Sequence, residues 1–417
     1  QMAYNFIDMI WIGRLGSGAV AGVGVAGMFT WFSNGLVMMA KMGGQVKIGH
    51  CLGAGDDDDA RRYLGAALKL GIVFALFFGI GINILAHSLI GFFHLSSPAV
   101  IHDAVLYLRI TCGLVIFTFM NQIFTSSFNV YGDSRTPFIM NTCGLVSNVI
   151  ADPLLIFGIG PFPEMGIRGA ALATGIGQTT GLCIYLLTSR IKPLNLQFKM
   201  QYFKPDKNIC RRLYGIGIPA TLNMALPSFL ISALNILLGT FSDTQVLVLG
   251  IYYKLQSFLY LPANGMIQGM RPIMSYNYGA RESSRVRSIY QTALYIIILI
   301  LLAGTVLCLA VPDQLIHLFS DNTETIVAGR RALRIICIGF AVSAVSVVTE
   351  GALEAMGKGI HSLLISCMRY IVLILPLAFI FSHFFGVNGV WHAFWITEVI
   401  TAVTSGLIFY RQYRAIA

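Results

Sequence analysis

The sequence predicts an all-α integral membrane protein with twelve transmembrane helices in two pseudo-symmetric six-helix bundles. Of its 417 residues, 56% are hydrophobic and only 11% are charged. A soluble domain carries about 25% charged residues, so most of this chain has no aqueous surface to cover. Twelve units of about 35 residues would each hold one spanning helix of about 20 residues and its loop.

Twelve apolar segments follow one another along the chain. They cover residues 1–13, 19–40, 63–86, 104–130, 138–158, 169–189, 215–240, 246–270, 289–311, 328–356, 362–385 and 389–410. The first is short, starts at Gln1 and lacks a basic leader, so we expect the natural chain to continue upstream and not to begin with a signal peptide. We divide the chain into an N-terminal lobe (1–190), a cytoplasmic connector (191–214) and a C-terminal lobe (215–417).

Basic residues are distributed unequally between the alternate loops. About 19 Lys and Arg residues fall on one side and about 5 on the other. The positive-inside rule then places both termini in the cytoplasm of a multi-pass plasma (inner) membrane protein. The net charge of +10 belongs to these loops. Because they form no basic stripe with interleaved aromatic residues, we expect no nucleic-acid partner.

The two halves resemble each other when one is shifted by 226 or 220 positions. The glycines matched in this way are Gly43 with Gly269, Gly53 with Gly279, Gly166 with Gly386, and Gly169 with Gly389. Because each half has six spans, both halves have the same orientation in the membrane. Such parallel repeats are typical of transporters that move two bundles about a central site.

Polar residues form stripes on two spans of the first half. Gln1, Asn5 and Asp8 recur at the spacing of one helix face, and Asn148 and Asp152 are one turn apart. A carboxylate at membrane depth is costly and indicates function by default. These stripes therefore predict a polar cleft inside the first bundle.

Other polar residues of the first half face the same predicted cleft, namely Thr174, Gln178 and Asn121. Two carboxyl groups in a poorly solvated cleft do not both ionise easily, which suits them to exchange protons. In the purely structural alternative, Asp152 accepts backbone hydrogen bonds near a membrane end and Asp8 caps a kink.

The second half has no counterpart of Asp8, and its carboxylates lie elsewhere. Glu350 and Glu398 are deep in their spans, whereas Glu354 is close to a turn and is expected to be solvated. Glu350 and Glu398 form either a structural ion pair with Arg369 or Lys254, or a cation site.

A soft aromatic surface could adapt to varied substrates. Met224 and Tyr253 would line such a pocket, because thioethers and rings contact cations and flat molecules favourably. The full set of substrate-cavity candidates is Gln178, Asn121, Met224, Tyr253, Glu350 and Glu398.

No Walker loop, HExxH or GxSxG motif is present. We therefore expect neither a nucleotide-driven motor nor an enzyme, and no cofactor or resident metal. An ion gradient is the remaining energy source, which makes the chain a candidate secondary active transporter.

Four sequence segments resemble the multidrug and toxic compound extrusion (MATE) family. They are YNFIDMIWIGRLGSGAVAGVG (4–24), YGDSRTPF (131–138), NVIADPLLIFGIGPFPEMGIRGAALAT (148–174) and SYNYGA (275–280). The resemblance runs over essentially the whole chain. It implies two six-helix lobes that export organic cations and amphipathic compounds in exchange for protons or sodium ions.

Within that family, the chain is similar to the DinF-like branch. This likeness implies a cation-coupling cluster in the N-terminal lobe formed by Gln1, Asp8, Asn148, Asp152 and, as the nearest match on the sixth span, Thr174. The other main branch carries an acidic residue on the seventh span for a C-lobe sodium site. Span seven has none here, which favours coupling in the N-terminal lobe, although Glu350 keeps the C-lobe site open.

The resulting hypothesis is a proton-coupled multidrug antiporter that works by alternating access. Expected partners are drug-like small molecules, H+ or Na+, and membrane lipids, and the expected state is a monomer. Alternatives are sodium coupling at a C-lobe site, a flippase for lipids or lipid-linked precursors, and a receptor or scaffold without transport. A flippase would require a larger basic cavity than the few intramembrane cations indicate.

Overall fold

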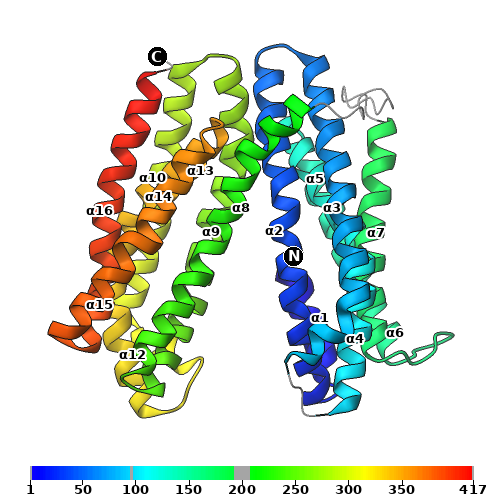
Figure 1. Ribbon diagram of the computed structural model, residues 1–417, viewed down its shortest axis with the longest axis horizontal. Helices are drawn as coiled ribbons and strands as arrows, with labels where there is room; N and C mark the ends of the chain where they lie inside the picture. Colours follow the sequence, from blue (N-terminus) through cyan, green and yellow to red (C-terminus); the bar gives the residue numbers. More distant parts are fainter. Residues whose placement is uncertain (1, 94–96, 192–206, 416–417) are drawn as a thin grey trace. The chain divides into compact units, whose positions relative to one another are not determined.

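The structure is a computed structural model that describes residues 2–93, 97–191 and 207–415. Over these residues every regular element is a helix, and the long helices of each unit lie alongside one another (Figure 1). The expected all-α membrane fold is confirmed.

The first half contains long apolar helices together with shorter ones. They are α1 (Met2–Gly13), α2 (Ser17–Gly53), α3 (Asp57–Gly91), α4 (Pro98–Gly113), α5 (Val115–Val130), α6 (Arg135–Ile156) and α7 (Ile167–Ile191).

The second half contains long helices together with shorter pieces. They are α8 (Lys207–Gly239), α9 (Asp243–Gly279), α10 (Ser283–Ala310), α11 (Pro312–His317), α12 (Thr323–Ile336), η2 (Cys337–Gly339), α13 (Phe340–Ala355), α14 (Gly359–Cys367), η3 (Met368–Leu373), α15 (Ile374–Phe385) and α16 (Val387–Arg414).

Membrane-spanning candidates agree with the predicted segments. Within the described residues, 10 helices are long and apolar enough to cross a membrane, and there are 11 if the bent pair α4 and α5 is one span. Helix α1 has 12 residues and is too short to count as a membrane-spanning helix. It corresponds to the first predicted segment. All twelve predicted apolar segments therefore fall on helices.

The helix boundaries differ from the predicted ones where helices extend beyond their apolar centre. Helices α2 and α9 each have 37 residues. At 1.5 Å per residue, such a helix is about 55 Å long and must leave a hydrocarbon core of about 30 Å. Apolarity marks only the part of a helix that is in lipid, so it underestimates these lengths.

Two further differences have local causes. The single predicted segment 104–130 is bent by 43° between α4 and α5, because the backbone leaves the helical region at Leu114, with φ −92° and ψ 4°. The predicted connector 191–214 overlaps the start of α8 at Lys207, and its residues 192–206 lie outside the described residues.

The chain forms two compact units. The first comprises Gln1–Ile48 and Asp56–Gly217, and the second comprises Gly49–Gly55 and Ile218–Ala417. The end of α2 is thus grouped with the second unit, and the start of α8 with the first.

Two of the matched glycine pairs have the same geometry in the two units. Gly166 has φ +54° and Gly386 has φ +60°, a region that side-chain-bearing residues rarely adopt. Three residues later, a Cβ at Gly169 would clash with the backbone of Leu155 of α6, and a Cβ at Gly389 would clash with the backbone of Phe381 of α15. These glycines allow α7 and α16 to pack closely against the helix before each, which supports the internal repeat.

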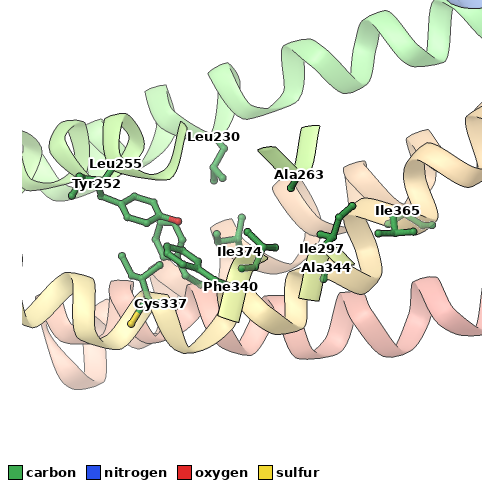
Figure 2. Close-up of a cluster of buried hydrophobic side chains, with 14 of the residues drawn as sticks. Leu230, Tyr252, Leu255, Ala263, Ile297, Cys337, Phe340, Ala344, Ile365 and Ile374 are labelled. Carbon is green, nitrogen blue, oxygen red and sulfur yellow. The ribbon is translucent and has the colours of Figure 1, made fainter. Parts of the chain in front are cut away.

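Packing inside the second unit is mostly apolar (Figure 2). Buried side chains from α8, α9, α10, α13, α14 and α15 meet in one cluster, which includes Leu230, Tyr252, Ile297, Phe340 and Ile365. Because lipid is as apolar as these side chains, the packing is stabilised mainly by close van der Waals contact and by polar contacts.

One such polar contact is centred on Glu354. Its Oε1 accepts hydrogen bonds from Asn223 Nδ2 of α8 at 3.0 Å and from Ser362 Oγ of α14 at 3.4 Å. Its Oε2 forms an ion pair with Arg271 Nη2 of α9 at 2.5 Å. Glu354 is only 3% exposed. The prediction of a solvated Glu354 was wrong, because proximity to a turn does not reveal which helices pack around it.

The close contacts at Gly169 and Gly389 predict that adding a side chain at either position lowers stability. We expect Gly169→Ala and Gly389→Ala each to lower the thermal unfolding temperature in detergent, since overpacking costs about 1–3 kcal/mol. Gly24→Ala and Gly250→Ala are matched controls, because a Cβ at these positions has no neighbour within 4 Å. Equal unfolding temperatures in all four variants would contradict the close helix approach.

The Glu354 cluster predicts a second stability effect. Glu354→Gln removes the charge that compensates the largely buried Arg271, and breaking such a pair costs about 3–5 kcal/mol. A clear drop in unfolding temperature is expected, whereas Glu164→Gln in the exposed α6–α7 loop should have little effect. A drop no larger than that of the control would show that the ion pair does not stabilise the unit.

Candidate functional site

Three helices of the first unit bring polar side chains together. Helix α1 supplies Asp8, helix α6 supplies Asn148 and Asp152 from successive turns, and helix α7 supplies Thr174. The close approach of α6 and α7 at Gly169 keeps their polar faces within reach of each other.

Asn148 lies between the two carboxyl groups. Its Nδ2 donates to Asp8 Oδ1 at 3.2 Å and to Asp152 Oδ1 at 3.3 Å. Thr174 Oγ1 donates to Asp8 Oδ2 at 3.0 Å, and it also lies 3.1 Å from the carbonyl oxygen of Ala170. We call Asp8, Asn148, Asp152 and Thr174 the carboxyl cluster.

The carboxyl cluster is buried. Asp8 is 4% exposed, and Asn148 and Asp152 are fully buried. Asn148 Oδ1 and Asp152 Oδ2 have no hydrogen-bond partner within the described part of the chain. The two carboxyl groups are also close enough to interact directly with each other. Negative charge on both groups at once is therefore costly, and a proton or another cation would relieve it.

A cavity of about 250 Å³ opens beside the cluster. Its walls come from α1, α2, α4, α5 and α7, and they include Asp8, Asn34, Tyr107, Thr174 and Gln178. Among the described residues of this lining, Asp8 is the only charged one. The described lining thus combines polar hydroxyl and amide groups with one carboxyl group and includes no basic side chain.

Two predicted residues of the first unit form a separate contact in the same bundle. Asn121 Nδ2 donates to Gln178 Oε1 at 2.9 Å and to the carbonyl oxygen of Gln178 at 2.7 Å. Gln178 lines the cavity, so this pair connects α5 to the cavity wall on α7.

Two other members of the predicted set cannot be placed as side chains. Gln1 lies outside the described residues. Asn5 belongs to α1, but its side chain also lies outside what the structure describes.

A second charged group lies inside the second unit. Arg369 Nε donates to Glu398 Oε1 at 3.0 Å, and Arg369 Nη2 forms an ion pair with the same oxygen. Arg369 sits in the π-helical segment η3; such wide turns are frequent at functional sites. Of the two ion-pair partners that the sequence allowed, Arg369 pairs with Glu398. The other, Lys254, lies over the ring of Phe319.

Glu350 lies on α13, near this ion pair. Its Oε1 and Glu398 Oε2 are buried, and neither has a hydrogen-bond partner among the described residues. The hydroxyl group of Tyr253 is in the same situation. Met224 is half-buried on α8. The six predicted substrate-cavity residues therefore fall into two sets, with Gln178 and Asn121 in the first unit and the other four in the second.

Sequence reasoning missed part of the cavity wall. Tyr107 and Thr111 line the cavity from α4, one turn apart on a segment predicted only as an apolar span. Their i, i+4 spacing was a usable signal. It did not show which neighbouring helix that face would meet.

Within the described residues, no three His, Cys, Asp or Glu side chains are grouped so as to hold a metal ion. The carboxyl cluster instead combines two acids with neutral amide and hydroxyl groups. Such a set can bind and release a proton or accept a positively charged group.

Comparison with known proteins identifies relatives over most of the chain. The MatE family model matches residues 1–154 and 219–380. A protein of Shewanella oneidensis named FAD transporter is 26% identical over 96% of this chain and 89% of its own length. The probable multidrug resistance protein YoeA of Bacillus subtilis is 26% identical over 94% of this chain and 86% of its own length.

Solved structures share the fold at low sequence identity. The Vibrio cholerae MATE transporter VcmN in its bent form superposes with a TM-score of 0.92 at 21% identity, covering 100% of this chain and 93% of that one. A MOP superfamily transporter from Pyrococcus furiosus gives a TM-score of 0.88 at 22% identity, covering 100% and 92%. The helical fold, the paired units and the extent of the family match lead to one conclusion. This chain belongs to the MatE family of multi-pass membrane transporters, and it is not an enzyme.

Proposed function

We propose that this transporter exports organic cations and amphipathic, drug-like compounds in exchange for protons, with the carboxyl cluster as the coupling site. The observation that carries this proposal is the position of two buried carboxyl groups, bridged by Asn148, beside a cavity without basic side chains. Relatives named multidrug resistance proteins support the same substrate class.

The proposed mechanism follows from competition for one site. When Asp8 and Asp152 carry negative charge, the cavity attracts a cationic substrate. Proton binding removes that charge, and the substrate loses its electrostatic attraction. Coupling then requires only that proton and substrate prefer different conformations of the transporter. The hydrogen bonds of Asn148 and Thr174 join α1, α6 and α7, so a change of protonation acts on three helices together.

The charge of the cavity also separates substrate classes. One relative is named FAD transporter, and FAD carries phosphate groups. The cavity lining here holds a carboxyl group and neither Lys nor Arg. Electrostatic complementarity therefore favours cations over phosphate-bearing substrates at this site.

We propose a plasma-membrane location with both termini in the cytoplasm and a monomeric transporting unit. The excess of about 19 over 5 basic residues on one set of loops supports this orientation. The likeness to the DinF-like branch rests on Asp8, Asn148 and Asp152, which agree with coupling in the first unit.

Two alternatives make different demands on the structure. Sodium coupling in the second unit would use Glu350 and Glu398, but the guanidinium of Arg369 already pairs with Glu398. A flippase for lipids or lipid-linked precursors would need basic groups to hold a phosphate-bearing head group, and the described cavity of the first unit has none.

The coupling proposal predicts the behaviour of Asp8→Asn and Asp152→Asn. Either change removes a titrating group without changing its size. In proteoliposomes, we expect proton-driven efflux of a cationic dye to fall at least about fivefold, since coupling energies of 1–3 kcal/mol correspond to about 5–150-fold. Asp103→Asn is the control on α4, outside the cavity lining. Efflux at the parent rate in both variants would refute this site.

A sodium gradient tests the alternative site. With the proton gradient collapsed, we expect a sodium gradient to drive little efflux in the parent protein, and Glu350→Gln to leave proton-driven efflux largely intact. Sodium-driven efflux that survives Asp8→Asn but is lost in Glu350→Gln would transfer coupling to the second unit. No flux under either gradient would favour the flippase.

A further inference from the structure

A second hollow of the first unit lies on the side of α4 that carries His102 and Arg109. It has a volume of about 420 Å³. It is formed by the C-terminal part of α3 and by α4. Its lining is His87, Pro98, Ile101, His102, Val105, Leu106 and Arg109. We call it the α3–α4 groove. It shares no residue with the cavity beside the carboxyl cluster.

The groove combines basic and apolar side chains. Among the described residues that line it, the titratable ones are His87, His102 and Arg109, and all three are exposed. No carboxylate of the described residues forms an ion pair with Arg109. The nearest carboxylate in sequence, Asp103, is about 100° around α4 from His102, and it does not line the groove.

Helix geometry places the two basic residues of α4 on one face, beside a groove whose surface is mostly apolar. His102 and Arg109 are seven residues apart, so they share one face of α4 and are separated by about 10 Å along its axis. Buried Val105 of α4 lines the groove, whereas buried Leu108 and Cys112 do not. Asn83 of α3 donates to the carbonyl oxygen of Arg109 at 3.3 Å, which fixes α3 against α4 at the deep end of the groove.

The groove opens on a surface that suits lipid. Next to His87, helix α3 exposes Ile80, Ile84 and Leu85, which are 58%, 73% and 52% exposed. Arg109 lies five residues inside the predicted apolar segment 104–130, about 8 Å along the helix axis from the start of that segment. A guanidinium at such depth without a carboxylate partner is costly, unless its long side chain reaches towards an anionic group nearer the interface.

We propose that the α3–α4 groove binds a glycerophospholipid from the adjacent leaflet. Its phosphate would contact Arg109 and His102, with His87 opposite, and an acyl chain would lie against Ile101, Val105 and Leu106. A phosphate group supplies the negative charge that the described residues do not. Each basic residue near an anionic lipid surface raises the affinity for that lipid by about tenfold or less. The apolar wall would contact the acyl chain of the lipid.

The test is native mass spectrometry of the full chain titrated with three lipids of equal acyl composition. The probes are dioleoylphosphatidylglycerol, dioleoylphosphatidylcholine and phosphate-free dioleoylglycerol. We expect both phospholipids to bind more tightly than dioleoylglycerol, and the double variant Arg109→Gln/His102→Gln to weaken phospholipid binding at least about fivefold. Arg168→Gln, which removes an exposed cation outside the groove, should bind as the parent does.

Arg109→Lys provides a variant that keeps the charge. We expect Arg109→Lys to retain most phospholipid binding, because a phosphate accepts a hydrogen bond from either lysine or arginine. This variant keeps the test valid if the double variant is unstable. Dioleoylglycerol binding equal to that of the phospholipids would overturn the proposal. Equal weakening in Arg168→Gln would do the same, since it would indicate a non-specific effect of surface charge. Both outcomes are independent of drug transport.

Discussion

Polar groups held away from water constrain this structure most strongly. The Asn148 amide donates to both Asp8 and Asp152, and Thr174 supplies a further hydrogen bond to Asp8. In a membrane these groups cannot turn to bulk water for compensation, so the helices that carry them must stay together. The positions of α1, α6 and α7 thus depend on the same contacts that give the site its chemistry.

Close packing makes that arrangement possible. Where a helix must approach its neighbour, glycine removes the side chain that would prevent it, as at Gly169 beside Leu155 and at Gly389 beside Phe381. The same device occurs at these two matched positions of the two units. Small residues allow the backbones to approach, and van der Waals contact then stabilises the pair without a hydrophobic driving force.

The two units compensate buried charge in different ways. In the second unit, the carboxylates of Glu354 and Glu398 each face an arginine of the same unit. In the first unit, the hydrogen bonds that Asp8 and Asp152 accept from described residues come from the neutral side chains of Asn148 and Thr174, and the two carboxyl groups lie beside each other. A carboxylate with its own arginine is already satisfied, whereas a pair of acids held by amide and hydroxyl groups can still respond to a proton or a cationic substrate. Glu350 of the second unit also has a buried oxygen without a hydrogen-bond partner among the described residues, but it lies near Arg369. We therefore expect the ion response mainly in the first unit.

The sequence by itself determined the fold class, the twelve helical segments and the identity of Asp8, Asn148, Asp152 and Thr174 as polar groups at membrane depth, because hydropathy and helical spacing are local properties. It could not determine that Asn148 bridges both acids, that Tyr107 faces their cavity, or that Glu354 is buried against Arg271. Nor could apolarity show where helices continue past the membrane or bend at Leu114. These features depend on which faces of distant helices meet. Local hydropathy and spacing along the chain do not specify those contacts, which only the tertiary structure defines.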